Sequence, residues 1–534
     1  MQTVDAVIVG AGFAGLYLLH KARGLGLTTR GFEAAPDVGG TWYWNGYPGA
    51  RCDVESLEYS YSFLPELETE WQWTERFATQ PEILRYANHV ADRLDLRRGF
   101  TFNTRVTAAR WDEKARHWIV TAGAETLAAR HLILGTGCLS STTIPDFPGL
   151  SDYKGITLHT GTWPNDAPDL TGKRIGVIGT GSSGVQVIPE LAKIAGHLTV
   201  FQRTPHFCVP ARNAPLAPEK IAHWHANFPE LRRYAREDTR SGWLAEFPVK
   251  SAFEATAEER RAEYDRRWAK GGGNFLYAYN DILSNAAANA TAADYIRERI
   301  RETVKDPATA EKLVPHGYPI GAKRICLGTD FYETFNRPNV TLVDVKSAPI
   351  TGLTETGLRT TAGDFDLDVI VFATGFDAVT GAILRIDIQG PGGSLAEVWA
   401  DGPVAMMGVM IHGFPNLHMI TGPGSPSVLS NVLASVEQHV EWVSDLLGYM
   451  KQNDLDRVEP EAEAQARWVA HVAEVAERTL MGQANSWYMG ANVPGKPRVF
   501  LPYIGGVDAY RRHCNKVVAA GYEGFRLDRV RQDA

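Results

Sequence analysis

The sequence predicts an α/β fold with two Rossmann-like dinucleotide-binding domains and a helical insertion. Three observations lead to this prediction. A buried apolar run is followed by a GxGxxG turn at 10–15, and the same pair of features recurs at 174–184. Between about 215 and 312 the residues are instead rich in charged and aromatic side chains. A strand, a glycine turn and a helix in that order form the phosphate-binding start of a Rossmann unit.

Length, composition and charge limit the possibilities. The chain has 534 residues, 44% of them hydrophobic and 22% charged, as in globular proteins, and its length suggests about three or four domains. The net charge is −8 and no basic block occurs, which argues against a nucleic-acid partner. No apolar run of about 18 residues occurs, so no membrane span is expected. A monomer and a weak homo-oligomer both stay open.

The cysteines indicate the redox compartment. There are five, none in a CxxC motif and none spaced with histidines as zinc ligands. An odd and sparse set fits free thiols in a reducing cytoplasm, and no metal site is expected. Residues 6–19 are nearly all apolar, but no Lys or Arg precedes them and glycines interrupt them. They therefore predict a strand, a turn and a helix rather than a signal peptide.

The first Rossmann unit begins at the N-terminus. A buried strand at 5–9 leads into Gly10, Gly12 and Gly15, a helix runs to about residue 24, and a second strand covers 28–32. The first glycine makes the tight turn, the second lets the backbone approach a pyrophosphate, and the third lets the helix pack closely. Glu33 stands about 20 residues further on, where an acid can hold ribose hydroxyls.

Two kinds of strand follow in this unit. Apolar and polar residues alternate at 106–111 and at 117–121, which predicts a small antiparallel sheet. Residues 130–135 then return to a buried strand.

The second Rossmann unit follows a Pro- and Gly-rich crossing at 141–172. A buried strand leads into Gly179, Gly181 and Gly184, and the next strand covers 198–202. Arg203 stands where an acid would be expected, followed by Thr204. An acid would repel a 2′-phosphate, whereas an Arg can hold it with two hydrogen bonds, so this site predicts NADPH. The alternative is that Arg203 only ends a strand and meets solvent.

The rest of the chain has mainly helical signals. Residues 256–259 form a capping box, and a loop is expected at 271–273. Residues 369–372 predict another buried strand. Helical spacing is seen in two sets of apolar residues, which are Ile296, Ile300 and Val304, and Val436, Val440, Val443 and Leu447.

Two dinucleotide sites in one chain indicate internal electron transfer. NADPH delivers hydride, protein side chains cannot accept it, and a flavin is the natural acceptor. Flavoenzymes that pass electrons to a disulfide need a close cysteine pair, and the nearest pair in this sequence is Cys138 and Cys208. Dioxygen is the other common outlet for the electrons.

Residues 153–164 read Tyr-Lys-Gly-Ile-Thr-Leu-His-Thr-Gly-Thr-Trp-Pro. They match the FxGxxxHxxxW(P/D) fingerprint of Baeyer–Villiger monooxygenases, with Tyr153 in place of Phe. The chain resembles that family, and most closely its phenylacetone and steroid monooxygenase subgroup. The related flavin-containing amine and sulfide oxygenases lack the Trp-Pro ending. His159 and Trp163 look like part of a linker that couples domain motions, so the fingerprint indicates the family rather than direct chemistry.

The resemblance covers almost the whole chain. It extends through residues 39–42, 47–53, 323–324, 368–375, 422–427 and the region of Trp487. It implies FAD and NADPH as cofactors, with a ketone and dioxygen as substrates. By this resemblance, FAD and dioxygen supply a flavin peroxide that attacks the ketone carbonyl to give a tetrahedral adduct, and migration of one carbon to oxygen then gives an ester or lactone. The peroxide and the adduct are both anions, so the site needs a positive charge that cannot be lost, and an Arg supplies it.

The resemblance also implies roles for single residues. Arg324 matches the active-site arginine, and Asp53 matches the acid that holds it. Lys323 matches a residue that helps Arg203 to hold the 2′-phosphate, and Trp487 matches a mobile-loop tryptophan that covers nicotinamide. Judged without the family, Lys323 and Arg324 would be surface residues, Asp53 a turn former and Trp487 an ordinary packing residue.

The candidate site is therefore large. Catalytic roles are expected for Arg324 and Asp53, and no metal ligand is expected. The candidate cofactor-binding residues are Gly10, Gly12, Phe13, Gly15, Glu33, Gly40, Thr41, Trp42, Asp53, Tyr59, Val106, Gly179, Thr180, Gly181, Ser182, Ser183, Gly184, Gln186, Arg203, Thr204, Lys323 and Trp487.

The expected domains follow from the two Rossmann units and the family arrangement. The FAD-binding domain covers 1–140 plus 385–534, the NADPH-binding domain covers 150–210 plus 325–380, and the helical insertion covers 215–320. The second candidate function is a flavin-dependent monooxygenase of sulfides or amines. A third, from another class, is a flavin-bearing NADPH sensor or an oxidase that makes only hydrogen peroxide. Cyclic, linear, aryl and steroid ketones all stay open.

Overall fold

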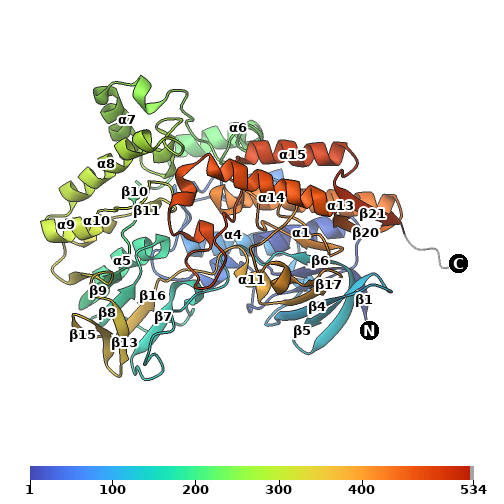
Figure 1. Cartoon of the computed structure of the whole chain (residues 1–534), viewed down its shortest axis with the longest axis horizontal. Coiled ribbons are helices and arrows are strands. Elements are labelled where there is room, and N and C mark those ends of the chain that lie inside the picture. Colours follow the sequence, from blue (N-terminus) through green and yellow to red (C-terminus); the bar gives the residue numbers. More distant parts are fainter. Residues whose placement is uncertain (530–534) are drawn as a thin grey trace.

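The computed structural model describes residues 1–529, which form two α/β units (Figure 1). The first unit, with the blue N-terminal strands, lies on the right of Figure 1, and the second lies on the left. No helix among these residues is long and apolar enough to cross a membrane. No group of three or more His, Cys, Asp or Glu side chains among them is placed to hold a metal ion.

The first unit is built on a sheet that, among the described residues, has nine strands. Its order is β18 (Gly393–Ser394), β17 (Asp387–Gly390), β4 (Val106–Asp112), β5 (His117–Ala122), β6 (Glu125–Leu134), β1 (Thr3–Val9), β2 (Thr29–Phe32) and β3 (Phe100–Thr101), with β19 (Leu417–Met419) also on β6. β1 is parallel to β2 and β6, and α1 (Phe13–Gly24) follows β1. The predicted strand, helix and strand are confirmed to within a few residues.

The antiparallel pairing predicted for 106–111 and 117–121 is confirmed, but the two strands do not form a small sheet of their own. β4 and β5 do form an antiparallel hairpin, with Trp111 opposite Trp118. However, β6 pairs antiparallel with β5 on one edge and parallel with β1 on the other. A strand can form antiparallel hydrogen bonds along one edge and parallel hydrogen bonds along the other. The β4–β5 hairpin is therefore continuous with the main sheet through β6.

The second unit has a parallel sheet. Its order is β12 (Val340–Asp344), β9 (His197–Gln202), β8 (Arg174–Ile178), β16 (Val369–Phe372) and β7 (Ile156–His159). α5 (Ser182–Ile194) follows β8. The strands β8 and β16 are almost wholly buried, as their continuous apolar runs predicted. A smaller antiparallel sheet of β13 (Ile350–Thr354), β14 (Gly357–Thr360) and β15 (Gly363–Asp366) belongs to the same part of the chain.

The insertion is helical, as predicted. It contains α6 (Pro218–Glu237), α7 (Ala257–Lys270), α8 (Ala286–Thr303) and α9 (Pro307–Leu313). Thr256 and Glu259 form the predicted capping box on α7, and Ile296 and Ile300 are fully buried on α8. β10 (Cys208–Pro210), which precedes the insertion, pairs with β11 (Cys326–Gly328), which follows it, so the two ends of the insertion lie side by side.

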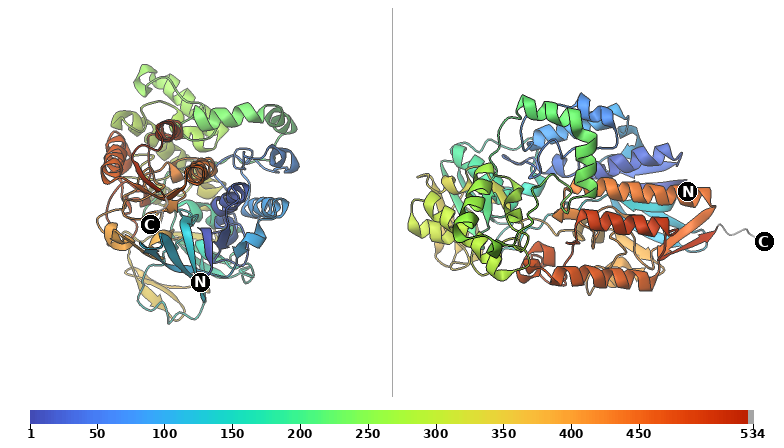
Figure 2. Two further views of the ribbon diagram at one scale, coloured as in Figure 1. Left: turned by 90° about the vertical axis from the view of Figure 1, so that its right-hand side faces the viewer. Right: turned by 90° about the horizontal axis from the view of Figure 1, so that it is seen from above.

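The insertion is shared between the two cores. Trp224 of α6 packs in the core of the first unit, where its indole donates to Glu68 at 3.0 Å. The helices α7 to α9 instead bury residues such as Tyr264 in the core of the second unit. Figure 2, from above, shows α6 beside the first unit and the other insertion helices over the second. Helical periodicity could not predict this division, because it marks a buried face but not what covers that face.

The C-terminal part of the chain returns to the first unit. β17 to β19 complete its sheet, and α13 (Val432–Gln452) packs on α1. α14 (Ala462–Glu477), α15 (Val507–Ala519) and the hairpin of β20 (Leu455–Pro460) and β21 (Phe525–Arg529) follow. We therefore propose the discontinuous domains 1–140 plus 385–534 and 150–210 plus 325–380, with 215–320 inserted; of the first range, residues 530–534 lie outside the described residues.

Candidate active site

A cavity of about 870 Å³ lies between the two units and is lined by both glycine turns. The candidate residues that line it are Gly10, Gly12, Phe13, Glu33, Gly40, Thr41, Trp42, Asp53, Tyr59, Val106, Gly179, Thr180, Gly181, Ser182, Ser183, Gln186, Arg203, Thr204, Lys323, Arg324 and Trp487. Gly15 and Gly184 do not line it; they lie in the first turns of α1 and α5, on the side that faces the preceding strand. A Cβ atom there would stand 1.7 Å from the carbonyl oxygen of Gly10 or 2.3 Å from that of Gly179, respectively. These two glycines allow the helix to pack closely on the strand.

The first glycine turn fits a dinucleotide pyrophosphate. Gly10 has a φ of +100°, and a Cβ atom there would lie 2.6 Å from the carbonyl oxygen of Gly135, so only glycine fits. No side chain of the described residues caps the start of α1, so its first N–H groups can receive an anion. Glu33 is buried beside the turn and accepts from the N–H groups of Ala11 at 2.6 Å and Ala35 at 2.7 Å. The turn can therefore receive the pyrophosphate of the predicted FAD, and Glu33 lies beside it where an acid can hold the ribose.

The second glycine turn has the same construction. Gly179 has a φ of +108°, and a Cβ atom there would lie 2.5 Å from the carbonyl oxygen of Ala373. A Cβ atom at Gly181 would meet no atom of the described residues within 4 Å, so its backbone faces open space. α5 begins directly afterwards at Ser182, with its N–H groups toward the same space. The turn therefore suits a second pyrophosphate.

Two cations lie beside the second turn. Arg203 follows β9 and is exposed, and Lys323 comes from the loop before β11. Burial lowers the pKa of Lys323, and the charge of Arg203 lowers it further. Two cations this close repel each other unless an anion neutralises them, so the pair fits a 2′-phosphate.

His206 is a residue of this region that the sequence interpretation missed. It lines the same cavity, and burial, followed by the charges of Lys323 and Arg203, lowers its pKa to about 3. Its Nδ1 atom is buried and has no hydrogen-bond partner among the described residues. A neutral imidazole with an unused nitrogen can bond to a ligand here. The only signal in the sequence was its place two positions after Thr204.

Arg324 and Asp53 form an ion pair in the cavity. The Nε and Nη2 atoms of Arg324 lie 2.8 and 2.7 Å from Oδ2 of Asp53, and its Nη1 donates to the carbonyl oxygen of Val428 at 2.6 Å. Burial by itself lowers the pKa of Arg324, but the charge of Asp53 outweighs it, so the pKa is raised. Arg324 therefore keeps its proton, and a guanidinium with five N–H donors has some left for a ligand.

Three loops that are far apart in the sequence build this pair. Asp53 follows Cys52, whose N–H donates to the carbonyl oxygen of Ala78 at 3.1 Å. Arg324 follows a turn at Gly321, which has a φ of +90°. Val428 lies in the short 3₁₀ turn η5 (Ser427–Leu429) just before α13. The sequence predicted Asp53 and Arg324 but not the carbonyl group of Val428, because a backbone acceptor leaves no mark in the sequence.

Trp487 lies half-buried at the edge of the cavity, on the 3₁₀ turn η7 (Trp487–Met489). The segment that carries it is tied to the chain crossing between the units, because Nδ2 of Asn492 donates to the carbonyl oxygen of Phe376 at 2.7 Å. The same segment also contacts the loop before β11, because Nζ of Lys323 in that loop donates to the carbonyl oxygen of Asn485 at 2.9 Å. This segment therefore contacts two of the elements that line the cavity.

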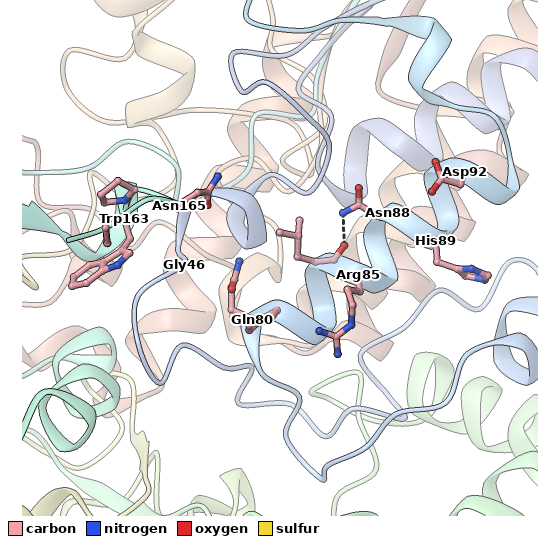
Figure 3. Close-up of a pocket in the computed structure, with 12 residues that line it drawn as sticks. Gly46, Gln80, Arg85, Asn88, His89, Asp92, Trp163 and Asn165 are labelled. Carbon is pink, nitrogen blue, oxygen red and sulfur yellow. Dashed lines mark hydrogen bonds between the residues drawn. The ribbon is translucent and has the colours of Figure 1, made fainter. Parts of the chain in front are cut away.

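The fingerprint residues His159 and Trp163 pack at the junction between the units. Nδ1 of His159 accepts from the N–H of Gly161 at 2.9 Å, and the N–H of Trp163 donates to the carbonyl oxygen of Trp44 in the first unit at 3.0 Å. Trp163 also lines an open pocket of about 760 Å³ together with residues of α4 (Gln80–Arg93), and Figure 3 shows these lining residues. The fingerprint thus contacts both units, and its role in coupling their motions stays a prediction.

The match to a family model agrees with this nucleotide-binding architecture. Residues 4–225 match the model described as pyridine nucleotide-disulphide oxidoreductase. All five cysteines lie in the described part of the chain, and each is unpaired and buried. The match covers the first Rossmann unit and the start of the second.

Comparisons over the whole chain are more specific. A Baeyer-Villiger monooxygenase of Pseudooceanicola batsensis is 44% identical over 532 residues, which are 98% of this chain and 96% of the relative. A solved structure of oxidized steroid monooxygenase bound to NADP is 50% identical, with a TM-score of 0.94 and coverage of 99% of this chain and 100% of its own. A complex of OTEMO with FAD and NADP is 41% identical, with a TM-score of 0.95 over 98% of this chain and 99% of its own. With relatives this similar over almost its whole length, the chain belongs to the Baeyer–Villiger monooxygenase family.

Proposed function

We propose that this chain uses FAD, NADPH and dioxygen to insert one oxygen atom beside a ketone carbonyl, which gives an ester or a lactone. The observation that carries the proposal is the Arg324–Asp53 pair in a cavity between two dinucleotide turns. An NADPH sensor or a peroxide-forming oxidase needs no fixed cation at this place. The name of the Pseudooceanicola relative and the two cofactors of the OTEMO complex support the same conclusion.

Each nucleotide turn takes one cofactor. The first turn and Glu33 hold FAD, and the second turn holds NADPH, with Arg203, Thr204 and Lys323 on its 2′-phosphate. When bound, FAD accepts hydride from NADPH and activates dioxygen for transfer to the ketone. Selection of NADPH over NADH then depends on the two cations beside the second turn.

Arg324 stabilises the negative charge that develops on the substrate. The carbonyl oxygen of the ketone becomes negative as its carbon turns tetrahedral, and N–H donors that are already oriented stabilise it without reorganisation. Asp53 and the carbonyl group of Val428 supply that orientation, because they hold the guanidinium from two sides. A lysine could not replace it well, since a lysine has fewer donors and loses its proton more readily when buried.

Trp487 covers the cavity at the nicotinamide end. Closure of its segment over the bound cofactors excludes water, which protects the activated oxygen until the ketone is in place. The enzyme acts in the cytoplasm as a monomer or weak homo-oligomer. The five unpaired, buried cysteines support a reducing compartment.

Product analysis tests the proposal. The purified protein is loaded with FAD and given NADPH, dioxygen and a panel of cyclic, linear, aryl and steroid ketones with one aryl methyl sulfide. We expect mass spectrometry to identify an ester or lactone from at least one ketone. Sulfoxide as the sole product would favour the heteroatom monooxygenase. Hydrogen peroxide alone would favour the oxidase or sensor.

A further inference from the structure

Gln186 connects the second nucleotide unit to the loop that carries Asp53. Its Oε1 atom accepts from the hydroxyl of Tyr47 at 2.8 Å and from the N–H of Arg51 at 3.4 Å. Its Nε2 atom donates to the carbonyl oxygen of Arg51 at 3.1 Å. The carboxamide thus holds both backbone groups of Arg51, which stands two positions before Asp53.

The loop of residues 47–53 is packed closely on α5, the helix that carries Gln186. Gly49 has a φ of +83°, and a Cβ atom there would lie 2.5 Å from the carbonyl oxygen of Gln186. Tyr47 and Ala50 are buried in the core of the second unit, although they belong to the first unit in the sequence.

The other side of the same loop is fixed to the first unit. The N–H of Gln80 donates to the carbonyl oxygen of Ala50 at 2.8 Å, and the N–H of Cys52 donates to that of Ala78 at 3.1 Å. Residues 50–52 are therefore held between α5 on one side and residues 78–80, at the start of α4, on the other. Any displacement of α5 relative to α4 acts on the backbone that leads directly into Asp53.

We propose that Gln186 is a positioning residue, which transmits occupancy of the second nucleotide turn to the Asp53–Arg324 pair. The proposal rests on the proposed function, because that function makes the turn at Gly179–Gly184 the NADPH site. The start of α5 receives the pyrophosphate, and Gln186 lies one helical turn further along the same helix. A bound dinucleotide steadies this part of α5, and the carboxamide passes the constraint to Arg51 and so to Asp53. The guanidinium of Arg324 is then held most firmly when the dinucleotide is present.

Hydrogen–deuterium exchange with and without NADP⁺ tests this coupling without any turnover. In the FAD-loaded wild-type protein, NADP⁺ should slow exchange both in the turn at 179–186 and in the loop at 50–54. Gln186→Met keeps the length of the side chain but removes its hydrogen bonds. In this variant, NADP⁺ should still protect 179–186. The added protection of 50–54 should fall by about tenfold, which corresponds to about 1.4 kcal/mol, the size of a typical net hydrogen bond.

Two further variants complete the exchange experiment. Lys193→Met changes an exposed residue of the same helix and should behave like the wild type. Tyr47→Phe removes only the hydroxyl group and should cause a smaller loss in the same loop, so the test does not depend on one variant folding. Wild-type protection of 50–54 in Gln186→Met would overturn the proposal, as would a wild-type protein in which NADP⁺ leaves that loop unaffected.

Turnover provides a second readout. For Gln186→Met we expect the fraction of consumed NADPH that yields ester to fall, with more hydrogen peroxide formed. Because the carboxamide is engaged with Tyr47 and Arg51, this loss of coupling should exceed any change in the KM for NADPH. A general folding defect would lower the rate of NADPH oxidation and the ester fraction alike. An unchanged ester fraction would contradict the positioning role. Failure of the wild-type protein to make any ester would refute the proposed function instead, and the exchange result would still be decided separately.

Discussion

Replacement of Arg324 by alanine removes the one group on which the proposed chemistry depends most. In the structure, its guanidinium makes two contacts with Asp53 and one with the carbonyl group of Val428. The substitution deletes the positive charge and also leaves the carboxylate of Asp53 without its partner. The cavity then changes from a place that favours an anion to one that opposes it.

The expected magnitude follows from these contacts. Loss of one preorganised donor to a developing oxyanion typically lowers the rate by about a hundredfold to a thousandfold, or about 3 to 4 kcal/mol. Here a full charge is lost, and the side chain of Asp53 is only 29% exposed, so solvent compensates for it only in part. We therefore expect ester formation to fall by about a thousandfold.

The assay follows NADPH, hydrogen peroxide and ester in the same reaction. In Arg324→Ala, NADPH oxidation should continue, with nearly all of its electrons recovered as hydrogen peroxide. Arg233→Ala is the control, because it removes the same charge from the exposed surface of α6, where Arg233 pairs with Asp238. Ester formation by Arg324→Ala within about tenfold of the wild-type rate, which corresponds to only about 1.4 kcal/mol, would refute the role of Arg324.

Three further predictions concern cofactor choice and stability. Arg203→Ala should raise the KM for NADPH by about tenfold to a hundredfold, since hydrogen bonds to a charged group contribute about 1.5 to 3 kcal/mol, and steady-state kinetics should show little change with NADH. Burial raises the pKa of Glu58 from 4.5 to about 8, so the folded protein keeps a proton that the unfolded chain releases, and stability falls as pH rises between these values. Glu58→Gln should therefore raise the melting temperature near pH 8 and above but not near pH 4.5. Val379 is buried and has a φ of +66°, a backbone conformation that only glycine accepts without strain. In urea denaturation, the free energy of unfolding of Val379→Gly should therefore exceed that of Val379→Ala by about 1 kcal/mol.

Each of these predictions has a clear contrary result. Equal damage to NADPH and NADH kinetics would show that Arg203 does not read the 2′-phosphate. A melting-temperature gain of Glu58→Gln that is the same at low and high pH would exclude the proton of Glu58 as its cause. Greater stability of Val379→Ala than of Val379→Gly, the usual order in helices and strands, would mean that the turn carries no backbone strain.

Much of the fold could be predicted because its signals are local. The buried run before Gly10 and the one before Gly179 each fix a strand, a turn and a helix within about 25 residues. The division of the insertion between two cores depends on contacts such as Trp224 with Glu68, which lie far apart in the sequence. Continuation of the hairpin at Trp111 into the main sheet depends on which strand pairs with the free edge of β6. A pattern within one segment holds no information on either.

The site residues likewise divide into those with a local sequence signal and those that depend on contacts between distant segments. Arg203 was predicted from its place at the end of a strand, and Arg324 from its match to a family residue. His206, whose burial decides its protonation, could not be found, because burial is a property of the folded chain. Gln186 was expected only to bind a cofactor, yet its carboxamide is engaged with a loop more than a hundred residues away. Such contacts become visible only when the two units are placed together.

The most direct test of the central claim is one turnover experiment with isotopically labelled dioxygen. The FAD-loaded protein is given NADPH, a ketone that it accepts and dioxygen carrying the heavy isotope, and the product is analysed by mass spectrometry. We predict an ester or lactone that contains one labelled oxygen atom, placed between the carbonyl carbon and the carbon that migrated. An unlabelled product, or label found only in hydrogen peroxide and water, would contradict oxygen insertion by this enzyme.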